Sequence, residues 1–251
     1  MRMGKLSFVQ SEGNGAPDGH LSNGRGVHKA PLTTWNGVKG RQHFVQFYES
    51  DTFLVLTIAD YVSEGLRSGD TCILAATAKH IAMLDRFVQP SETVDSFRSS
   101  GRLITLEADQ MLLKIMDGEM PDEEKFRAVM MPFIEAGKQA GRNIRIFGEL
   151  VAVLVERGNP EASTRLEEFW NRLRKDYPFS LFCAYPTSAF AGLMRDQRNH
   201  ICDEHTVVIP DETYTTLRTD NERLRKIASL QHRIKELEAE LAQMDRSLLA
   251  G

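Results

Sequence analysis

Short apolar runs alternate with amphipathic stretches through the middle of the chain. The runs are rich in β-branched and aromatic residues, as strands are, and they lie at 43–48, 71–77, 102–108, 143–149, 179–186 and 205–210. Between them, apolar residues recur at helical spacing over 51–66, 79–88, 92–99, 122–140, 150–156 and about 160–173. The pattern therefore predicts strands and helices in alternation.

Strands that alternate with helices need crossover connections, and these produce a mainly parallel sheet with helices on both faces. The pattern thus predicts an α/β fold over residues 41–210. Ligands of such sheets bind at the carboxyl ends of the strands. We therefore expect functional side chains directly after strands, at Glu49, Asp51, 77–80, Glu149 and 185–188.

Residues 1–40 have a different composition. Eight of the 18 glycines fall there, and the apolar residues show no period. Such a segment cannot offset roughly 1–2 kcal/mol of backbone entropy for each ordered residue. We expect a disordered tail that is dispensable for folding, or alternatively a mildly basic arm that binds a phosphate or a partner.

After Pro210 the sequence predicts one long polar helix over residues 211–251. Its apolar residues repeat at spacings of three and four, which is an a/d seam. The seam consists of Ile227, Leu230, Ile234, Leu237, Leu241, Met244 and Leu248. It predicts a parallel two-stranded coiled coil over 217–249, and hence a homodimer, unless the helix folds back on its own domain.

Composition and charge narrow the class of protein. The net charge is −4, and no basic cluster of the kind that binds nucleic acid directly is present. No apolar run reaches the roughly 18 residues of a membrane span, and the N-terminus lacks a secretory signal. The three cysteines, Cys72, Cys183 and Cys202, suit reduced thiols. We expect a cytoplasmic protein.

The turn after the first strand bears on nucleotide chemistry. Neither G-x-x-x-x-G-K-[ST] nor G-x-G-x-x-G occurs, and the turn reads Glu49-Ser50-Asp51, whose carboxylates repel a triphosphate. The G-x-S-x-G elbow of hydrolases is also absent. We expect no enzyme activity, and in particular no ATP hydrolysis. The alternative is a residual nucleotide- or metal-binding enzyme.

A group of soft ligands lies near the end of the domain. His200, Cys202 and His205 are close in sequence, and Cys183 lies on the preceding strand. Zinc and iron favour such ligands. Because H-x-C-x-x-H is not a usual zinc spacing, a buried thiol beside helix-end histidines is the alternative interpretation.

Methionines gather over two adjacent helical stretches. They are Met111, Met116, Met120, Met130 and Met131. Methionine is adaptable and polarisable, so such a group either fills a core or lines an apolar ligand pocket. The sequence leaves both interpretations open.

Five blocks, in order over about residues 40–210, resemble one family. They read HFVQFYESDTFL, then GLRSGDTCILAAT followed by His80, then FGELVAVLVERGN with LEEFWN, then FSLFCAYP, and last ICDEHTVVIP. Together they resemble the MEDS domain, the methanogen/methylotroph sensory domain. The resemblance implies a degenerate KaiC- or RecA-like fold without its P-loop. It also implies a sensor of small molecules, with hydrocarbon derivatives as proposed ligands.

Strand-end geometry and the resemblance together suggest where a ligand binds. The candidate ligand-binding residues are His43, Tyr48, Glu149, Tyr185 and His205, with a pocket bordered by Tyr48, Glu149, Tyr185 and His205. Family members are fused to DNA-binding, histidine-kinase or other signalling parts, whereas only the coiled coil follows here. We expect a regulatory module that signals through its dimer, with a further signalling protein as partner. The residues indicate no particular cofactor.

Overall fold

The computed structural model describes Trp35, Val38 and residues 40–87, 91–215, 217 and 219–249. The strands are β1 (His43–Tyr48), β2 (Thr71–Ala76), β3 (Leu103–Glu107), β4 (Met116–Asp117), β5 (Met120–Pro121), β6 (Ile144–Gly148), β7 (Ser180–Pro186) and β8 (Val207–Ile209). The helices are α1 (Asp51–Arg67), α2 (Ala78–Phe87), α3 (Ser91–Ser99), α4 (Ala108–Ile115), α5 (Glu123–Gln139), α6 (Leu150–Glu156), α7 (Pro160–Asp176), α8 (Thr187–Ala191), α9 (Arg195–Glu204), α10 (Glu212–Thr215) and α11 (Asp220–Leu249).

Six strands form one parallel sheet in the order β3-β2-β6-β7-β1-β8. Every residue of β2, β6 and β7 is buried, because both faces of these inner strands are covered. β4 and β5 form a separate antiparallel ribbon. The predicted α/β class, with its mainly parallel sheet, is confirmed.

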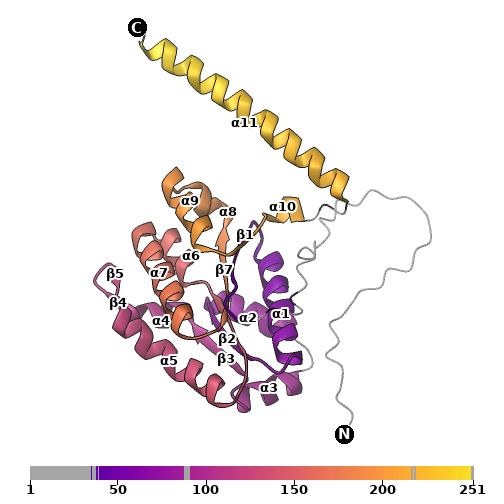
Figure 1. Cartoon of the computed structure of the whole chain (residues 1–251), viewed down its shortest axis with the longest axis vertical. Helices are drawn as coiled ribbons and strands as arrows, with labels where there is room; N and C mark the ends of the chain where they lie inside the picture. The colour runs from indigo at the N-terminus through magenta and orange to yellow at the C-terminus, as the bar shows by residue number, and fades with distance from the viewer. Residues whose placement is uncertain are drawn as a thin grey trace, which may run out of the picture.

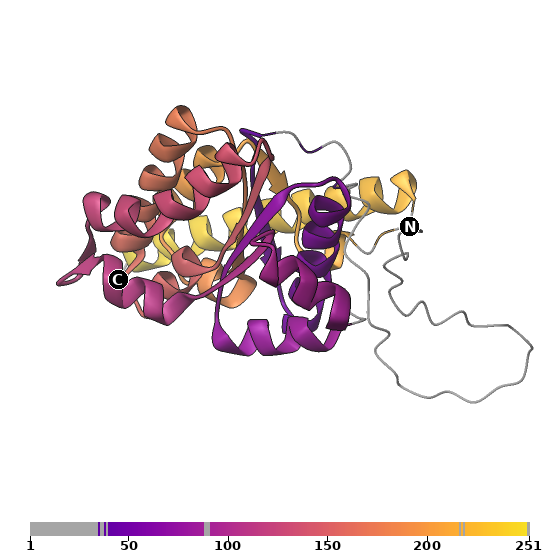
Figure 2. The same cartoon turned by 90° about the horizontal axis from the view of Figure 1, so that it is seen from below.

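Helices cover both faces of the sheet (Figure 1). α1, α2 and α3 pack on one face around a cluster that includes Phe182, and α4, α5, α6, α7 and α9 pack on the other around a cluster that includes Cys183. Figure 2 shows the strands between these two helical layers. Because successive side chains of a strand point to opposite faces, the parity of a position decides which layer its side chain meets.

The β4–β5 ribbon, α8 and α9 were not predicted, and α4 was expected only as the helical stretch around Met111. Met116 and Met120, expected on helical stretches, lie on the ribbon instead. The ribbon has strands of two residues each, and α8 has five residues. Elements of this length carry little of the periodic pattern from which elements are predicted. Their positions depend on packing against longer neighbours, such as α7 against β5 and α6 against α8.

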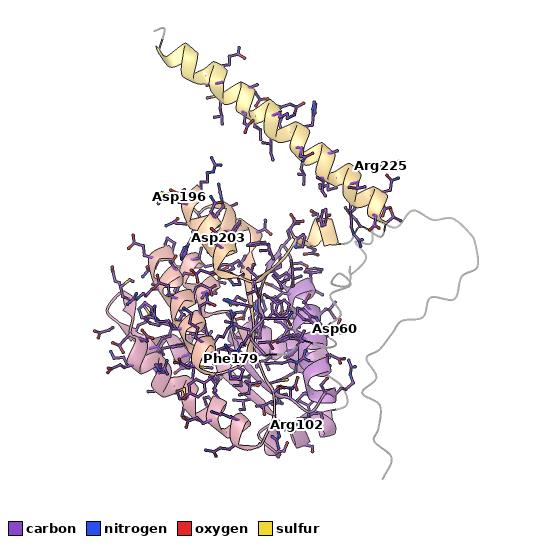
Figure 3. All side chains as sticks on the ribbon, in the orientation of Figure 1. Asp60, Arg102, Phe179, Asp196, Asp203 and Arg225 are labelled. Carbon is purple, nitrogen blue, oxygen red and sulfur yellow. The ribbon has the colours of Figure 1, made fainter. Side chains whose placement is uncertain are left out.

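The single helix predicted over 211–251 is two helices, which is a correction. α11 begins after Thr219, whose hydroxyl accepts a hydrogen bond from Glu222 N at 3.1 Å, while the Glu222 carboxylate accepts one from Thr219 N at 2.8 Å. This reciprocal cap starts a new helix. α11 extends away from the α/β body, and Figure 3 shows its side chains, Arg225 among them, projecting clear of it. Of the helices described, none is both long and apolar enough to cross a membrane.

Trp35 belongs to the packed core, although it precedes the domain start expected at residue 41. Its side chain is 5% exposed, and its ring meets Phe44 and Tyr61 edge-on at centroid distances of 5.3 and 4.9 Å. Its carbonyl oxygen accepts a hydrogen bond of 3.1 Å from Nη1 of the buried Arg145. Trp35 therefore does not belong to the disordered tail expected over 1–40, and its contacts lead us to expect that 1–40 is not wholly dispensable for folding. Val38 also packs against this core, and apart from residues 35, 38 and 40 the predicted disordered tail lies outside the described residues.

Replacing Trp35 with Ala should lower the free energy of unfolding by about 3–5 kcal/mol, the usual cost of an emptied aromatic site. Deleting residues 1–40 should cost at least as much, because it removes the same ring. Urea unfolding of wild type, Trp35→Ala and the deletion measures this. The control Trp35→Phe keeps a ring and should lose less. Coincident unfolding curves for wild type and Trp35→Ala would contradict the prediction.

Candidate functional site

A polar group lies where β1, β2 and β6 end. Glu149 caps α6 and is 2% exposed; its Oε2 accepts a hydrogen bond from Thr77 N at 2.7 Å, and its Oε1 lies 2.5 Å from His80 Nδ1. The other ring nitrogen of His80 lies 3.1 Å from Asp51 Oδ1. We call Asp51, Thr77, His80 and Glu149 the strand-end cluster. The His80 imidazole joins two carboxylates that come from different helix starts.

Charge within the strand-end cluster favours a protonated imidazole. Burial by itself lowers the pKa of His80, but the hydrogen bond and charge of Glu149, and then those of Asp51, outweigh it, so the net pKa is raised. For Asp51 the signs are reversed. Burial by itself raises the pKa of this carboxyl, but its hydrogen bonds with Lys79 and His80 outweigh burial, so the net pKa is lowered. An imidazolium has two N–H donors, which matches a carboxylate at each nitrogen.

The turn between β1 and α1 binds the side-chain carboxylate of Glu212. Glu212, the first residue of α10, accepts hydrogen bonds from Ser50 N at 3.1 Å, from Glu49 N at 3.3 Å and from the Ser50 hydroxyl at 3.1 Å. Backbone N–H groups at the start of a helix are the usual anion-binding position of nucleotide-binding sheets. Here Glu212 occupies that position, and it ties α10 to the residue beside Asp51.

A cleft of about 890 Å³ opens between α4, the β4–β5 ribbon and the connection from α6 to α7. Its apolar lining comes from Leu112, Leu113, Met116 and Leu154, and Asp109, Arg157 and Asn159 add polar groups. Asp109 and Arg157 form an ion pair at this site. A volume of this size with a few polar groups is typical of small-molecule sites.

The methionines divide between the two interpretations left open by the sequence. Met111 and Met130 are buried in the core, at 3% and 0% exposure. Met116 lines the cleft, and Met120 on β5 is 40% exposed. Core packing accounts for the first pair, whereas Met116 contributes to a cavity that a ligand can enter.

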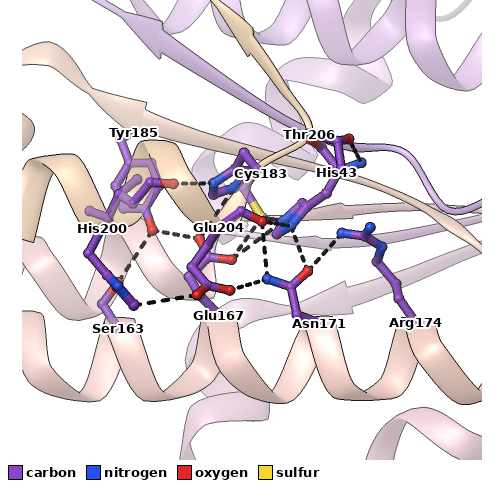
Figure 4. A network of polar contacts seen from close by, with 12 residues as sticks. His43, Ser163, Glu167, Asn171, Arg174, Cys183, Tyr185, His200, Glu204 and Thr206 are labelled. Carbon is purple, nitrogen blue, oxygen red and sulfur yellow. Dashed lines mark hydrogen bonds and ion pairs between the residues drawn. The ribbon is translucent and has the colours of Figure 1, made fainter.

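A second polar group lies on the other face of the sheet (Figure 4). His43, Glu167, Cys183 and His205, which we call the buried quartet, bring four donor atoms within 4.8 Å of one another. His43 Nε2 lies 3.4 Å from Cys183 Sγ and 3.4 Å from Glu167 Oε2. His205 Nε2 lies 3.6 Å from Glu167 Oε1, and Glu167 Oε2 lies 3.9 Å from Cys183 Sγ. All four side chains are buried.

The outer nitrogen of each histidine is held by carbonyl oxygens. His43 Nδ1 lies 3.1 Å from Asn171 Oδ1 and 3.1 Å from the Glu204 carbonyl, and His205 Nδ1 lies 2.6 Å from the Ile201 carbonyl. A carbonyl oxygen only accepts, so Nδ1 carries the proton in both neutral rings and Nε2 presents a lone pair. His205 Nε2 is buried and has no hydrogen-bond partner among the residues described.

Burial decides the ionisation of the quartet. It lowers the pKa of His205 to about 4 and that of His43 well below the usual range. It raises the pKa of Cys183 well above its usual range, and that of Glu167 to about 8, despite the 2.7 Å hydrogen bond that the Tyr185 hydroxyl donates to Glu167. The protein by itself therefore keeps all four groups mainly neutral near neutral pH.

The predicted ligand pocket does not form as a single site, which is a correction. Tyr48 lies against the strand-end cluster, with its ring 6.3 Å from that of His80, whereas Tyr185 and His205 contact Glu167 of the buried quartet. Tyr48 and Tyr185 belong to hydrophobic clusters on opposite faces of the sheet. Successive side chains of a strand point to opposite faces of the sheet, so residues at the ends of neighbouring strands can still lie on different faces.

Of the other candidates, His43 joins His205 in the buried quartet, and Glu149 joins the strand-end cluster. Neither His80 nor Asp51 was named as a ligand-binding candidate, although both follow strands and were expected to lie near a site. The carboxyl end of the sheet thus holds Tyr48, Glu149 and Tyr185, with Tyr185 on the opposite face from Tyr48, whereas His43 begins β1 and His205 precedes β8.

The predicted metal ligands are only half correct in their grouping. Cys183 and His205 meet, but His200 pairs with Glu204 at 3.8 Å, and Cys202 lies half-buried on α9. Residues two apart on a helix do not share a face, so His200 and Cys202 cannot both face the strand.

Glu167 was missed by the sequence analysis. It lies four residues after Ser163 and four before Asn171, on a line beside the apolar face of α7. Ser163 and Glu167 are both buried. A polar line next to an apolar one is the only signal that the sequence offers, and exposed helix faces often show the same signal.

The fold and these sites define a parallel α/β domain with a helical extension at its carboxyl end. A family model matches residues 42–200, and the chain belongs to this family, described as MEDS: MEthanogen/methylotroph, DcmR Sensory domain. The match confirms the resemblance seen in the five sequence blocks and indicates a sensory role. A comparison with curated proteins finds no match.

The raised pKa of His80 predicts a pH dependence of stability. Its folded-state pKa lies above the unfolded value of about 6.5, so its contribution is fully present below about pH 6.5 and is lost as pH rises through the folded-state pKa. His80→Gln should therefore be most destabilised, relative to wild type, near about pH 6, and the difference should shrink toward about pH 9. Urea unfolding across this range measures it.

The matched control is His232→Gln, because the His232 side chain is 78% exposed on α11. Its stability should follow that of wild type at every pH. A difference between wild type and His80→Gln that stays constant with pH would show that His80 acts by packing alone.

Proposed function

We propose that this chain is a non-catalytic sensory module in which a small molecule, bound in the cleft, changes the state of the C-terminal helix. The observation that carries the proposal is a continuous series of contacts from the cleft to α10. It runs along α6 to Glu149, through His80 to the start of α1, and from Ser50 to Glu212.

The cleft suits a mainly apolar ligand that carries one polar group. Leu113 is 76% exposed there, so a ligand can remove apolar surface from water. The paired Asp109 and Arg157, with Asn159, can orient a hydroxyl, amine or carboxyl group. This chemistry agrees with the hydrocarbon derivatives that the family resemblance implies.

α6 connects the cleft to the strand ends. It is seven residues long; Leu154 near its end lines the cleft, and Glu149 caps its start. Six of its residues, Leu150–Val155, are buried, so the helix moves as a packed unit. A ligand that binds one position of α6 better than another shifts the population of the Glu149–His80 contact by that difference in affinity.

Glu212 couples the strand ends to the output. Its carboxylate joins the β1–α1 turn to α10, which leads within a few residues to α11. Because Ser50 precedes Asp51, a displacement of the strand-end cluster reaches Glu212 through one peptide unit. The same carboxylate sits where a phosphate would bind, which supports the absence of ATP hydrolysis; that absence stays a prediction.

α11 is the proposed output. Six residues of its seam are 38–61% exposed, and the domain does not cover them: Ile227, Leu230, Ile234, Leu237, Leu241 and Met244. An apolar stripe of this length is stable in water when a second copy covers it. We propose a homodimer through a parallel coiled coil, and a signalling protein that responds to its state.

Thermal melts with a panel of short alcohols, amines, halides and carboxylic acids test the ligand site. We expect at least one compound to raise the melting temperature of wild type, because a ligand that binds only the folded state stabilises it. Leu113→Arg should abolish the rise, since it places a charge in the cleft. The control Leu224→Arg, at a 64% exposed position on α11, should keep it. If no compound stabilises wild type, or if Leu113→Arg responds as wild type does, the cleft is not the ligand site.

Hydrogen exchange with the same compound tests the transmission. In wild type the compound should change exchange in α10 and α11. In Glu212→Gln the melting temperature should still rise, but exchange in α11 should no longer respond. An equal response of α11 in both proteins would overturn the role given to Glu212 and leave the ligand site intact.

Ile234→Lys should convert the dimer to a monomer. It places a charge in the seam of both chains, and the α/β domain should stay folded because the position is exposed in the single chain. Sedimentation measures the mass, and circular dichroism checks the fold. Ala239→Lys, on the outer side of the same helix, should remain dimeric. A dimeric Ile234→Lys protein would exclude this seam as the interface.

A further inference from the structure

We propose that His43, Glu167, Cys183 and His205 bind one zinc ion in a closed, four-coordinate site. The site is separate from the ligand cleft, and only its effect on α11 rests on the output proposed above. It shares only Cys183 and His205 with the grouping that the sequence predicts.

The spacing of the donor atoms matches a tetrahedral ion. Zinc binds nitrogen and oxygen at about 2.0–2.2 Å and sulfur at about 2.3 Å, so its ligands lie roughly 3.3–3.6 Å from one another. With Glu167 Oε2 as the oxygen ligand, the separations are 3.4 Å from His43 Nε2 to Cys183 Sγ, 3.4 Å from His43 Nε2 to Oε2 and 3.9 Å from Oε2 to Cys183 Sγ, and the four donor atoms of the quartet all lie within 4.8 Å of one another. Small rotations of the side chains are enough to place an ion between them.

Both histidines are already oriented as metal ligands. Metal-binding histidines donate their outer N–H to a carbonyl or carboxylate, which turns the lone pair of the other nitrogen toward the ion. His43 does so to Asn171 and the Glu204 carbonyl, and His205 does so to the Ile201 carbonyl. The buried His205 Nε2 has no hydrogen-bond partner in the described part of the chain. Its lone pair is therefore available to coordinate the ion.

Charge also favours a divalent ion. On binding, the ion displaces one proton from the Cys183 thiol and one from the Glu167 carboxyl to solvent; the resulting thiolate and carboxylate together carry two negative charges, and the two imidazoles are neutral. A zinc ion therefore makes the buried site neutral overall, which removes the cost of burying either anion alone. A thiolate with two imidazoles selects zinc over magnesium or calcium, which prefer oxygen ligands.

The Tyr185 hydroxyl supports the same assignment from outside the quartet. It donates to Glu167 Oε1 at 2.7 Å, so it fixes the carboxylate in place. With four protein ligands and no open position, the site is structural rather than catalytic.

The ligands tie together segments that are distant in the sequence. His43 begins β1, Glu167 lies on α7, Cys183 lies in β7, and His205 lies two residues before β8. An ion at this point holds the start of β8 to the sheet. Because β8 leads into α10 and α11, zinc occupancy sets how firmly the output segment is attached.

Cobalt(II) is the probe, since a thiolate bound to cobalt gives a near-ultraviolet charge-transfer band and tetrahedral cobalt absorbs strongly in the visible. The full chain, stripped with a chelator, should bind one cobalt per chain with both features and lose them to one equivalent of zinc. Zinc should also raise the melting temperature. Stripped protein that binds neither ion, or cobalt spectra without a thiolate band, would overturn the site.

Cysteine variants identify which thiolate binds the ion, and the double variant does so with all four proposed ligands intact. The double variant Cys72→Ser/Cys202→Ser should keep the band, because Cys183 is then the only thiol. Cys183→Ser should lose it, and Asn171→Leu should weaken zinc binding by roughly 10–100-fold, as outer-shell changes do. A band that is lost in the double variant assigns the thiolate elsewhere and refutes the site, even if Cys183→Ser fails to fold.

Discussion

Both faces of the parallel sheet are covered by helices, so a polar side chain on an inner strand must find its partner inside the protein. Arg145 on β6 meets this constraint through Asp70, at 2.7 Å between two side chains that are each 2% exposed. Glu149, at the end of the same strand, meets it through Thr77 and His80. Gln46 on β1 is an exception: neither polar atom of its buried side chain has a hydrogen-bond partner in the part of the chain described.

The same constraint explains why polar groups gather at two places. On one face, the strand-end cluster balances carboxylates with His80 and Lys79. On the other face, the quartet has two potential anions and no cation among its members, so burial shifts the pKa of each group toward its neutral form. The first cluster is complete in itself, whereas the second has the composition of a site that a divalent ion completes.

Both places anchor the segment that leads to α11. His205, two residues before β8, belongs to the quartet, and Glu212, three residues after it, binds the β1–α1 turn. β8 itself pairs with β1 over only three residues. A strand this short contributes little by its ladder alone, so polar anchors on either side of it decide how firmly the C-terminal helix is attached. Signals from the domain therefore have two points at which they can act on that helix.

The sequence by itself determined the order of strands and helices, the seam of α11, the missing P-loop and the family. Each of these depends on residues close together in the chain, where period, capping and motif spacing are readable. One local prediction was wrong: the domain boundary at residue 40 left Trp35 outside the domain. Its burial depends on contacts with Phe44, Tyr61 and Arg145, which its neighbours in the sequence do not reveal.

Only the tertiary structure decided which polar residues meet. His43 and Cys183 lie 140 positions apart, and they touch because β1 and β7 are neighbours in the sheet and both side chains point to the same face. Tyr48 and Tyr185 lie at the carboxyl ends of the same two strands, yet their side chains point to opposite faces, so they do not share a pocket. In the sequence, Glu167 is one of several polar residues of an amphipathic helix. Only the packing of α7 against the sheet shows that its carboxylate contacts both His43 and His205. Local pattern specifies which residues are inside, but strand order and parity specify what each of them faces.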